Sequence, residues 1–271
     1  MIGGDLRILK KIDLKSFSMI AAFSGWPDAK RVATYAAQYL VEKLQAERIG
    51  EIDSAPFYDF TIQRPIVSIE QGLMKEYELP QNRIYAWKGT GKRAGLTILI
   101  GQEPHPNWPR YVESFFHIFS LGRIRRLCLL GGLIDHVPHT VEPVISGLAT
   151  NLNLLREVDA QGVERTTYMG PSSVHSLIIR ECARMGVSAL SLWGHAPPYI
   201  KDTDIYTAYH LLLKAVPIIG LDVDLTALRR EGEMLRKQLD AMMDQDQSFA
   251  ESVRQLELEY RIAHRKTDYI S

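Results

Sequence analysis

The stretch FSMIAAFSGWPD, residues 17–28, decides the fold class. Its first seven residues form an apolar run of strand length, and SGWPD at 24–28 then supplies turn residues. Beyond the turn, apolar side chains recur at helical spacing from Val32 to Leu44. Asp28 is a suitable N-cap, because its carboxylate can accept hydrogen bonds from the free amides of a first helical turn. The stretch therefore predicts a strand, a turn and a helix.

The chain beyond residue 95 repeats this alternation of apolar runs and helical patterns. We expect strands at 96–100, 126–131, 143–147 and 187–193, and helices at about 108–121, 172–185 and 203–219. Such alternation is typical of an α/β domain with a mostly parallel central sheet and helices on both of its faces.

Shorter segments between these two parts predict extended chain and one hairpin. Residues 57–62 (FYDFTI) and 65–69 indicate short extended pieces, since the residue before Pro65 is biased away from helix. Residues 83–88 and 96–100 flank the glycine-rich link 89–95, which is typical of a hairpin. We therefore expect an antiparallel pair beside the parallel strands, and hence a mixed sheet.

The last 50 residues, 222–271, differ in composition from the rest. They carry 19 charged side chains, against 45 in the preceding 221 residues. Apolar side chains recur at three-, four- or seven-residue steps from Leu221 to Met242 and again from Phe249 to Ala263. Each set predicts a helix with one narrow apolar stripe, and a polar link separates the two helices. We expect an α/β domain at 1–220 and an appended C-terminal helical hairpin at 221–271.

The overall composition excludes several classes of partner. Lysine plus arginine equals aspartate plus glutamate at 32 each, so no basic field favours nucleic acid or an anionic membrane, and we expect neither as a partner. Cys128 and Cys182 are too few for a disulfide framework or a four-thiolate metal site. Residues 1–11 lack the apolar region of a signal peptide, and no apolar run reaches about 18 residues, so we expect a cytoplasmic protein.

Four unusual loops, at 25–28, 101–108, 131–140 and 193–199, each follow a predicted strand. Ligands of open α/β sheets bind beyond the carboxyl ends of the strands, so these loops are expected to meet at one rim. Together with Arg64, the loops offer acidic, basic and aromatic side chains for a pocket. The candidate acid/base residues are Asp28, Glu103 and His139, and the candidate ligand-binding residues are Trp26, Arg64, Trp108 and His195.

A structural interpretation of the same loops stays open. Proline, glycine and tryptophan also shape tight turns, and histidines and carboxylates also cap helices or bond to the backbone. His139, which follows Pro138, either locks its turn or presents a fixed imidazole whose pKa a nearby Asp28 or Glu103 would raise. His136 and His139 lack a further compact ligand set, so we expect no metal. The glycine-rich link precedes a strand instead of opening a helix, so we expect no cofactor.

In their order along the chain, several short motifs resemble the proteasome assembly chaperone two family. They are FSGWPDA at 23–29, FYDF at 57–60 with Arg64-Pro65, GQEP at 101–104 with Trp108, VPHT at 137–140, YMGP at 168–171, and Trp193 with Pro198-Tyr199. The chain departs from the family pattern at three places. Val141 stands where an arginine usually follows, Lys30-Arg31 replace a glycine pair, and Ala196-Pro197 replace a Val-Pro-His type of sequence.

The resemblance implies a three-layer α/β/α fold similar to that of nucleoside phosphorylases and hydrolases. It also implies a homo-oligomer, trimeric in bacterial relatives, that acts as a chaperone-like binding or assembly protein with a protein partner. Relatives that dock on proteasome rings carry a penultimate tyrosine, whereas Tyr269 is third from the end, so we expect no tail-dependent docking.

An alternative function is that of an enzyme acting on a small polar or nucleoside-like substrate at the rim, hydrolase-like or phosphorylase-like. Some relatives are labelled ATP-dependent carboligases, but the sequence shows neither a nucleotide-phosphate loop nor a magnesium-binding carboxylate set. Whether the protein is an enzyme stays open at this point.

Overall fold

The computed structural model describes residues 5–10, 14–89 and 95–265. Predictions about residues 90–94 of the glycine-rich link and about Tyr269 fall outside these ranges. The elements are, in order, β1 (Leu6–Ile8), β2 (Leu14–Ser24), η1 (Ala29–Arg31), α1 (Val32–Lys43), β3 (Glu47–Ile52), β4 (Ile66–Glu70), β5 (Leu73–Glu78), β6 (Asn82–Trp87), β7 (Gly95–Gln102), α2 (Trp108–His117), η2 (Ile118–Leu121), β8 (Gly122–Ile134), β9 (Ile145–Ala149), α3 (Leu152–Ala160), β10 (Glu164–Arg165), α4 (Val174–Met185), β11 (Ser188–Ala196), α5 (Ile205–Ile218), α6 (Thr226–Gln245) and α7 (Gln247–Arg265).

Nine strands form one mixed sheet in the order β1-β3-β6-β7-β2-β8-β11-β9-β10. The four central strands, β7, β2, β8 and β11, run parallel. On one side the sheet continues through antiparallel pairs of β7 with β6, β6 with β3 and β3 with β1, and on the other β9 pairs antiparallel with β11. The predicted antiparallel pairing of 83–88 with 96–100 is confirmed, since Arg83 lies opposite Ile100.

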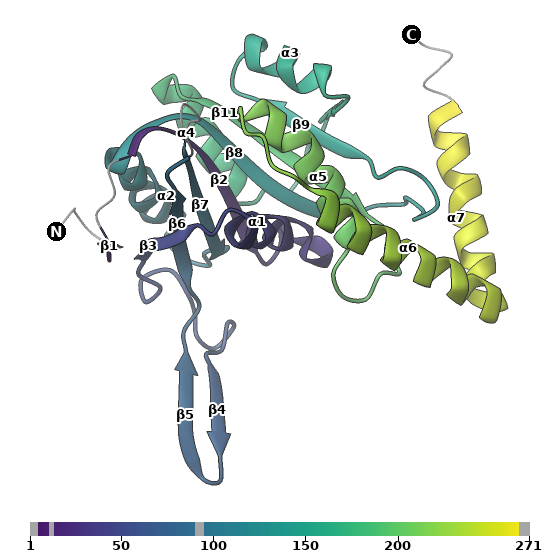
Figure 1. Cartoon of the computed structure of the whole chain (residues 1–271), viewed down its shortest axis with the longest axis horizontal. Helices are drawn as coiled ribbons and strands as arrows, with labels where there is room; N and C mark the ends of the chain where they lie inside the picture. Colours follow the sequence, from purple (N-terminus) through teal and green to yellow (C-terminus); the bar gives the residue numbers. More distant parts are fainter. Residues whose placement is uncertain (1–4, 11–13, 90–94, 266–271) are drawn as a thin grey trace.

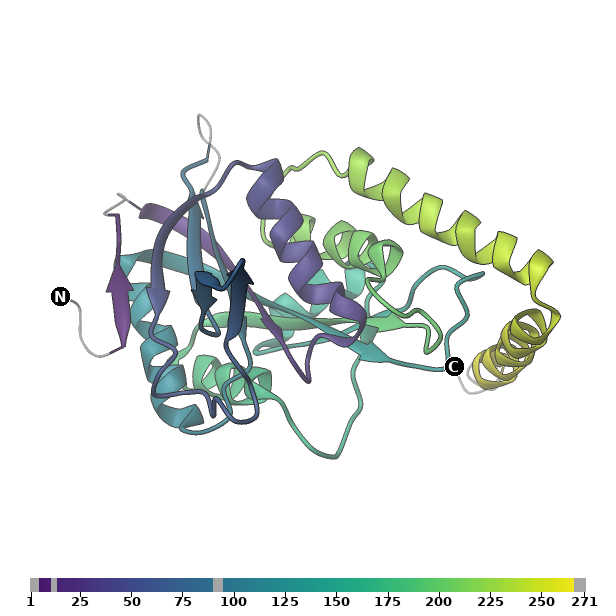
Figure 2. The same ribbon diagram turned by 90° about the horizontal axis from the view of Figure 1, so that it is seen from below.

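The side chains of β2 alternate between two cores, one on each face of the sheet. Ile20 and Ala22 belong to the core formed with α1 and α5, whereas Met19, Ala21 and Phe23 belong to the core formed with α2 and α4. A strand covered on both faces has an apolar sequence without polar alternation, which explains the apolar run at residues 17–23. Figure 2 shows the sheet between these two helical layers, and the predicted three-layer α/β fold is confirmed.

The prediction of extended chain at 57–62 is wrong, because this segment forms turns. The Asp59 carboxylate accepts from the Thr61 amide at 2.8 Å, and the Asp59 carbonyl accepts from the Ile62 amide at 3.0 Å. Such an Asx turn overrides the strand preference of the aromatic side chains. Phe57 and Tyr58 are instead buried anchors, and the Tyr58 hydroxyl donates to the Gln102 carbonyl at 2.7 Å.

Two long helices end the described chain, as predicted. α6 lies along α5, and α7 turns away from the end of α6 (Figure 1). The first turn of α6 is tied to the main body, since Leu228 is fully buried in the core of α1 and α5. Gly232 allows close approach, because a Cβ atom there would lie 2.8 Å from Cα of Tyr206 in α5. The division of the chain at residue 220 stays a prediction.

Strands β4 and β5 form a separate two-stranded hairpin, residues 66–78, which we call the arm. Figure 1 shows the arm projecting away from the rest of the molecule. Every residue of β5 is exposed. In the described ranges, no helix combines the length and apolarity needed to cross a membrane.

Candidate functional site

Asp28 is buried beside the first turn of α1. One of its carboxylate oxygens accepts from the amides of Ala33 and Thr34 at 2.9 and 3.0 Å, and the other accepts from the Thr34 hydroxyl at 2.5 Å. Burial raises the pKa of Asp28 to about 6, although these hydrogen bonds act in the opposite direction. Asp28 also lines a cleft of about 440 Å³ at the ends of β2 and β7. The Asp28 carboxylate thus caps the first turn of α1 as expected, but from a more distant position, because Arg31 occupies the N-cap of that helix.

Glu103 follows β7 and reaches the N-terminus of α4. Its carboxylate accepts from the Val174 amide at 2.8 Å, and burial raises its pKa. Nearby, Trp26 packs edge to face on Trp193, with ring centroids 6.3 Å apart, although Trp26 itself is 58% exposed. Glu103 therefore joins the loop after β7 to α4, and the two tryptophans cover the adjoining sheet end.

His139 is buried between the α/β body and α6. Its amide and its Nδ1 both lie within hydrogen-bond distance of the Tyr199 hydroxyl, at 2.7 and 2.6 Å, and its Nε2 lies 3.3 Å from Asp240 Oδ1. Burial lowers the pKa of His139, and this effect outweighs the attraction of the Asp240 carboxylate. The carboxylate partner is thus Asp240 on α6, and the pKa moves down instead of up.

His195 lies at the end of β11, in contact with the neighbouring strands. Its Nδ1 is 2.7 Å from Asp135 Oδ2, and its Nε2 is 2.8 Å from Ser146 Oγ. His195 and His139 line one cavity beneath α6, but its volume of about 10 Å³ is roughly that of a single water probe. This cavity does not hold an organic ligand.

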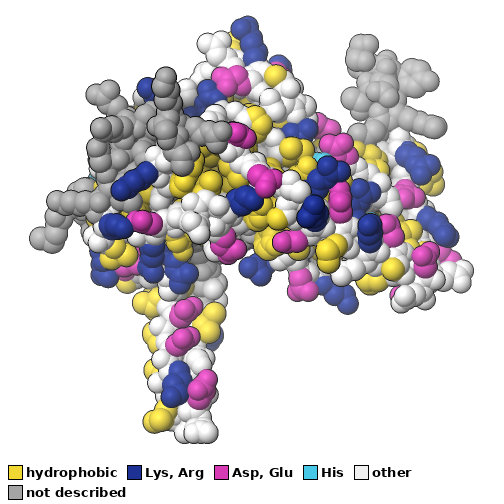
Figure 3. Space-filling model, in the orientation of Figure 1, with side chains coloured by type: hydrophobic (Ala, Val, Ile, Leu, Met, Phe, Trp, Pro, Cys, Tyr) yellow, Lys and Arg dark blue, Asp and Glu magenta, His cyan; other side chains and the backbone are white. Residues whose placement is uncertain are grey.

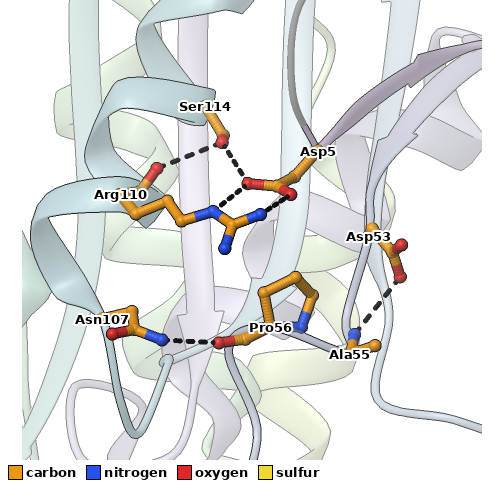
Figure 4. Close-up of polar contacts among 7 residues, drawn as sticks. All are labelled: Asp5, Asp53, Ala55, Pro56, Asn107, Arg110 and Ser114. Atoms are coloured by element: carbon orange, nitrogen blue, oxygen red, sulfur yellow. Dashed lines mark hydrogen bonds and ion pairs between the residues drawn. The ribbon is translucent and has the colours of Figure 1, made fainter.

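Trp108 opens α2, and its indole Nε1 donates to the Pro104 carbonyl at 2.7 Å. The same end of α2 fastens neighbouring segments, as Figure 4 shows. Arg110 holds Asp5 by two hydrogen bonds of 2.9 and 2.7 Å, and Asn107 donates to the Pro56 carbonyl at 3.0 Å. Arg64 lies apart from these residues, is exposed, and precedes the arm by two residues.

The seven candidate residues are therefore spread over several places in the fold. Asp28 borders the cleft at β2 and β7, Glu103 and Trp26 lie toward α4, and the two histidines share the small cavity beneath α6. Within the described ranges, no group of three or more His, Cys, Asp or Glu side chains is arranged to hold a metal ion.

Most of these candidate residues lie on or beside the loops that follow β2, β7, β8 and β11. A family model described as the PAC2 family matches residues 22–243, which include all four loops and most of α6. The chain belongs to the PAC2 family. The resemblance to the proteasome assembly chaperone two family is confirmed.

Several solved structures resemble this chain over most of its length. A PAC2 family protein from Streptomyces avermitilis has 27% identity and a TM-score of 0.75, over 85% of this chain and 97% of that one. A proteasome-assembly chaperone homologue from Mycobacterium tuberculosis has 26% identity and a TM-score of 0.79, over 87% and 99%. A second M. tuberculosis protein, of unknown function, shares the fold at 20% identity and a TM-score of 0.87, over 98% and 92%. No curated protein matches the sequence.

Several residues of these regions were not found by sequence reasoning. Asp240 is 101 residues from His139 in the chain, so no local pattern links the two. His175 is buried on α4, 3.2 Å from Ser191 Oγ through its Nδ1, and its burial lowers its pKa to about 3. Arg31 and Arg83 line the same cleft as Asp28, and Arg31 was noted only as a departure from the family pattern.

Proposed function

We propose that this PAC2 protein is a cytoplasmic homo-oligomer that assists the assembly of a protein partner and contacts that partner through the arm. The arm is the observation that carries the proposal. An isolated two-stranded hairpin is at best marginally stable in water, so a projecting one needs a further contact to hold its shape.

The two faces of the arm differ in chemistry. Val67 lies opposite Tyr77, and Ile69 lies opposite Met74. A register shift between these two pairs leaves Lys75 as an extra residue of β5, so that all four side chains share one face. Each is between 45% and 64% exposed. Ile66 lies opposite Glu78 and Ser68 opposite Glu76, so the other face mixes apolar and acidic groups. Figure 3 shows hydrophobic and charged side chains distributed along the arm. The apolar face is suited to an apolar groove on a folded protein.

The likeness to a proteasome-assembly chaperone homologue supports a proteasome subunit as the partner class. The enzymatic alternative is less favoured, because Asp28, Glu103 and His139 each have structural hydrogen-bond partners and do not share one pocket.

The test uses the full chain and purified proteasome core subunits from the same organism. Val67→Thr, Ile69→Thr, Met74→Gln and Tyr77→Thr, combined, replace the apolar face while retaining strand-forming residues at three positions. We expect this variant to bind the proteasome subunits at least about tenfold more weakly in surface plasmon resonance, because it would lose a few buried apolar contacts. Glu76→Gln with Glu78→Gln is the matched control on the other face and should bind like the unchanged protein.

Sedimentation equilibrium of the unchanged protein tests the oligomer separately. A mass several times the 30.8 kDa of one chain is expected, and a mass of one chain would contradict the homo-oligomer. Equal binding by the apolar-face variant and the unchanged protein would contradict the role of the arm. Circular dichroism must show the same folded content for all variants.

A further inference from the structure

The cleft bordered by Asp28 lies where two neighbouring parallel strands send their chains to opposite faces of the sheet. Ser24 at the end of β2 lies opposite Gln102 at the end of β7. From β2 the chain enters α1, which packs in one core, and from β7 it enters α2, which packs in the other (Figure 2). In open α/β sheets, ligands bind in the crevice outside the carboxyl ends of such strands.

The cleft has the size and lining of a small-molecule site. Its volume of about 440 Å³ lies within the usual range for ligand pockets, roughly 300–1,000 Å³. Tyr85 and Ile100 give it an aromatic and an aliphatic wall. Ser24, Thr34 and three glutamines give it polar groups, and Arg31 and Arg83 give it two guanidinium groups.

The backbone that carries Arg31 is in an unusual conformation. Lys30 and Arg31 both have φ of 53°, in the left-handed region that glycine adopts without strain. The resemblance to the family predicts a glycine pair at these two positions. Strained residues of this kind persist where the surrounding structure holds them and are concentrated at ligand sites. Here the Lys30 carbonyl accepts from the Asp204 amide at 2.9 Å, and the residue that the strain places at the cleft is Arg31.

The charges of the cleft favour an anion. Among its described lining residues, Asp28 is the one carboxylate, and its oxygens already accept from Ala33 and Thr34. The position of Arg83 is fixed in part by a hydrogen bond that its Nε donates to Oε1 of Gln81, which also lines the cleft. Guanidinium groups match the oxygen geometry of phosphate, and two of them balance the charge of a phosphate dianion.

We propose that this cleft binds the phosphate group of a small phosphorylated molecule, with Arg31 and Arg83 as its anchors and Tyr85 beside its organic part. The site is separate from the arm, so this proposal and the proposed assembly function can fail independently. It assigns a ligand to a region for which sequence reasoning offered only Asp28.

Calorimetric titration with inorganic phosphate, at an ionic strength fixed with sodium chloride, tests the site. The unchanged protein should bind phosphate, and acetate should bind more weakly. Arg83→Gln and Arg31→Gly should each weaken phosphate binding by about tenfold or more, the usual effect of losing a charged hydrogen bond. Arg31→Gly also relieves the left-handed strain, so its thermal midpoint without phosphate should equal or exceed that of the unchanged protein.

Lys30→Gly is the matched control, since it relaxes the same backbone and removes a positive charge but leaves both guanidinium groups at the cleft. It should bind phosphate like the unchanged protein. Absence of phosphate binding in the unchanged protein, equal binding of acetate, or unchanged binding by Arg31→Gly and Arg83→Gln would each overturn the proposal. Equal losses in Lys30→Gly and Arg31→Gly would overturn it as well, because they would indicate an effect of backbone conformation or of overall charge.

Discussion

Replacing Asp28 by asparagine should change how the stability of the protein depends on pH. Burial raises the pKa of Asp28 from 3.8 to about 6 in the folded chain. Well below pH 3.8 the carboxyl group is protonated in both folded and unfolded chains. As the pH rises toward 6 and beyond, the unfolded chain releases the proton more readily, so the folded state loses stability. One pKa unit corresponds to about 1.36 kcal/mol, so the full loss is roughly 3 kcal/mol.

The asparagine side chain of the Asp28→Asn variant would be neutral throughout this range, and its oxygen can still accept from the Ala33 and Thr34 amides. The free energy of unfolding of Asp28→Asn, minus that of the unchanged protein, should therefore increase between pH 4 and pH 7 by up to roughly 3 kcal/mol. Urea unfolding followed by circular dichroism at pH 4.5, 5.5, 6.5 and 7.5 measures this difference at each pH.

Asp59→Asn provides the comparison. Asp59 is exposed, and hydrogen bonds from Thr61 lower its pKa, so its favourable contribution is complete above its unfolded value and is lost only on acidification. The free energy of unfolding of Asp59→Asn, minus that of the unchanged protein, should stay constant from pH 4.5 to 7.5. A flat or falling difference for Asp28→Asn over the same range would refute the reasoning, because it would show that the hydrogen bonds to Asp28 outweigh its burial.

Two further substitutions test the attachment of the C-terminal helices. Gly232→Ala should destabilise the protein by roughly 1–2 kcal/mol in urea unfolding, because the added Cβ would lie 2.8 Å from Cα of Tyr206 and this crowding exceeds the gain in helix propensity; an unchanged or raised midpoint would show that α6 can shift away from α5. His139→Gln should cost about 1 kcal/mol through the weakened contacts with Tyr199 and Asp240, and an unchanged thermal midpoint would argue against a structural role for His139.

The buried centre of the fold could be predicted from the sequence because its strands are covered on both faces. β2, β7, β8 and β11 have apolar sequences for that reason, and the helices between them show one apolar stripe each. β5 was not predicted, because all six of its residues are exposed and no core imposes a period of two on them. α3 was not predicted either, since it buries only Leu154 and Val158 and relies on the Asn151 cap at 2.9 Å from the Leu154 amide.

Among the candidate residues, contacts between residues close in the sequence could be predicted, whereas contacts between distant residues could not. The contact of Asp28 with Ala33 and Thr34 spans only five or six residues, and a capping carboxylate before this helix could be expected from the sequence, although the helix begins later than expected, at Val32. The contact of His139 with Asp240 spans 101 residues. Arg31 and Arg83 line one cleft because β2, β7 and β6 are neighbours in the sheet. Side chains brought together by tertiary packing leave no periodic signal in the sequence.

The lengths of the outermost strands bear on the risk that the sheet pairs with another chain. The nine-stranded sheet ends in β1, of three residues, and β10, of two, so it offers little backbone to which another chain could add. The arm has strands of five and six residues with exposed apolar side chains, which makes it the more hazardous edge. Glu70, Lys75, Glu76 and Glu78 interrupt its apolar residues, as gatekeeper charges do in other exposed strands. These charges oppose the pairing of the arm with a strand of another chain.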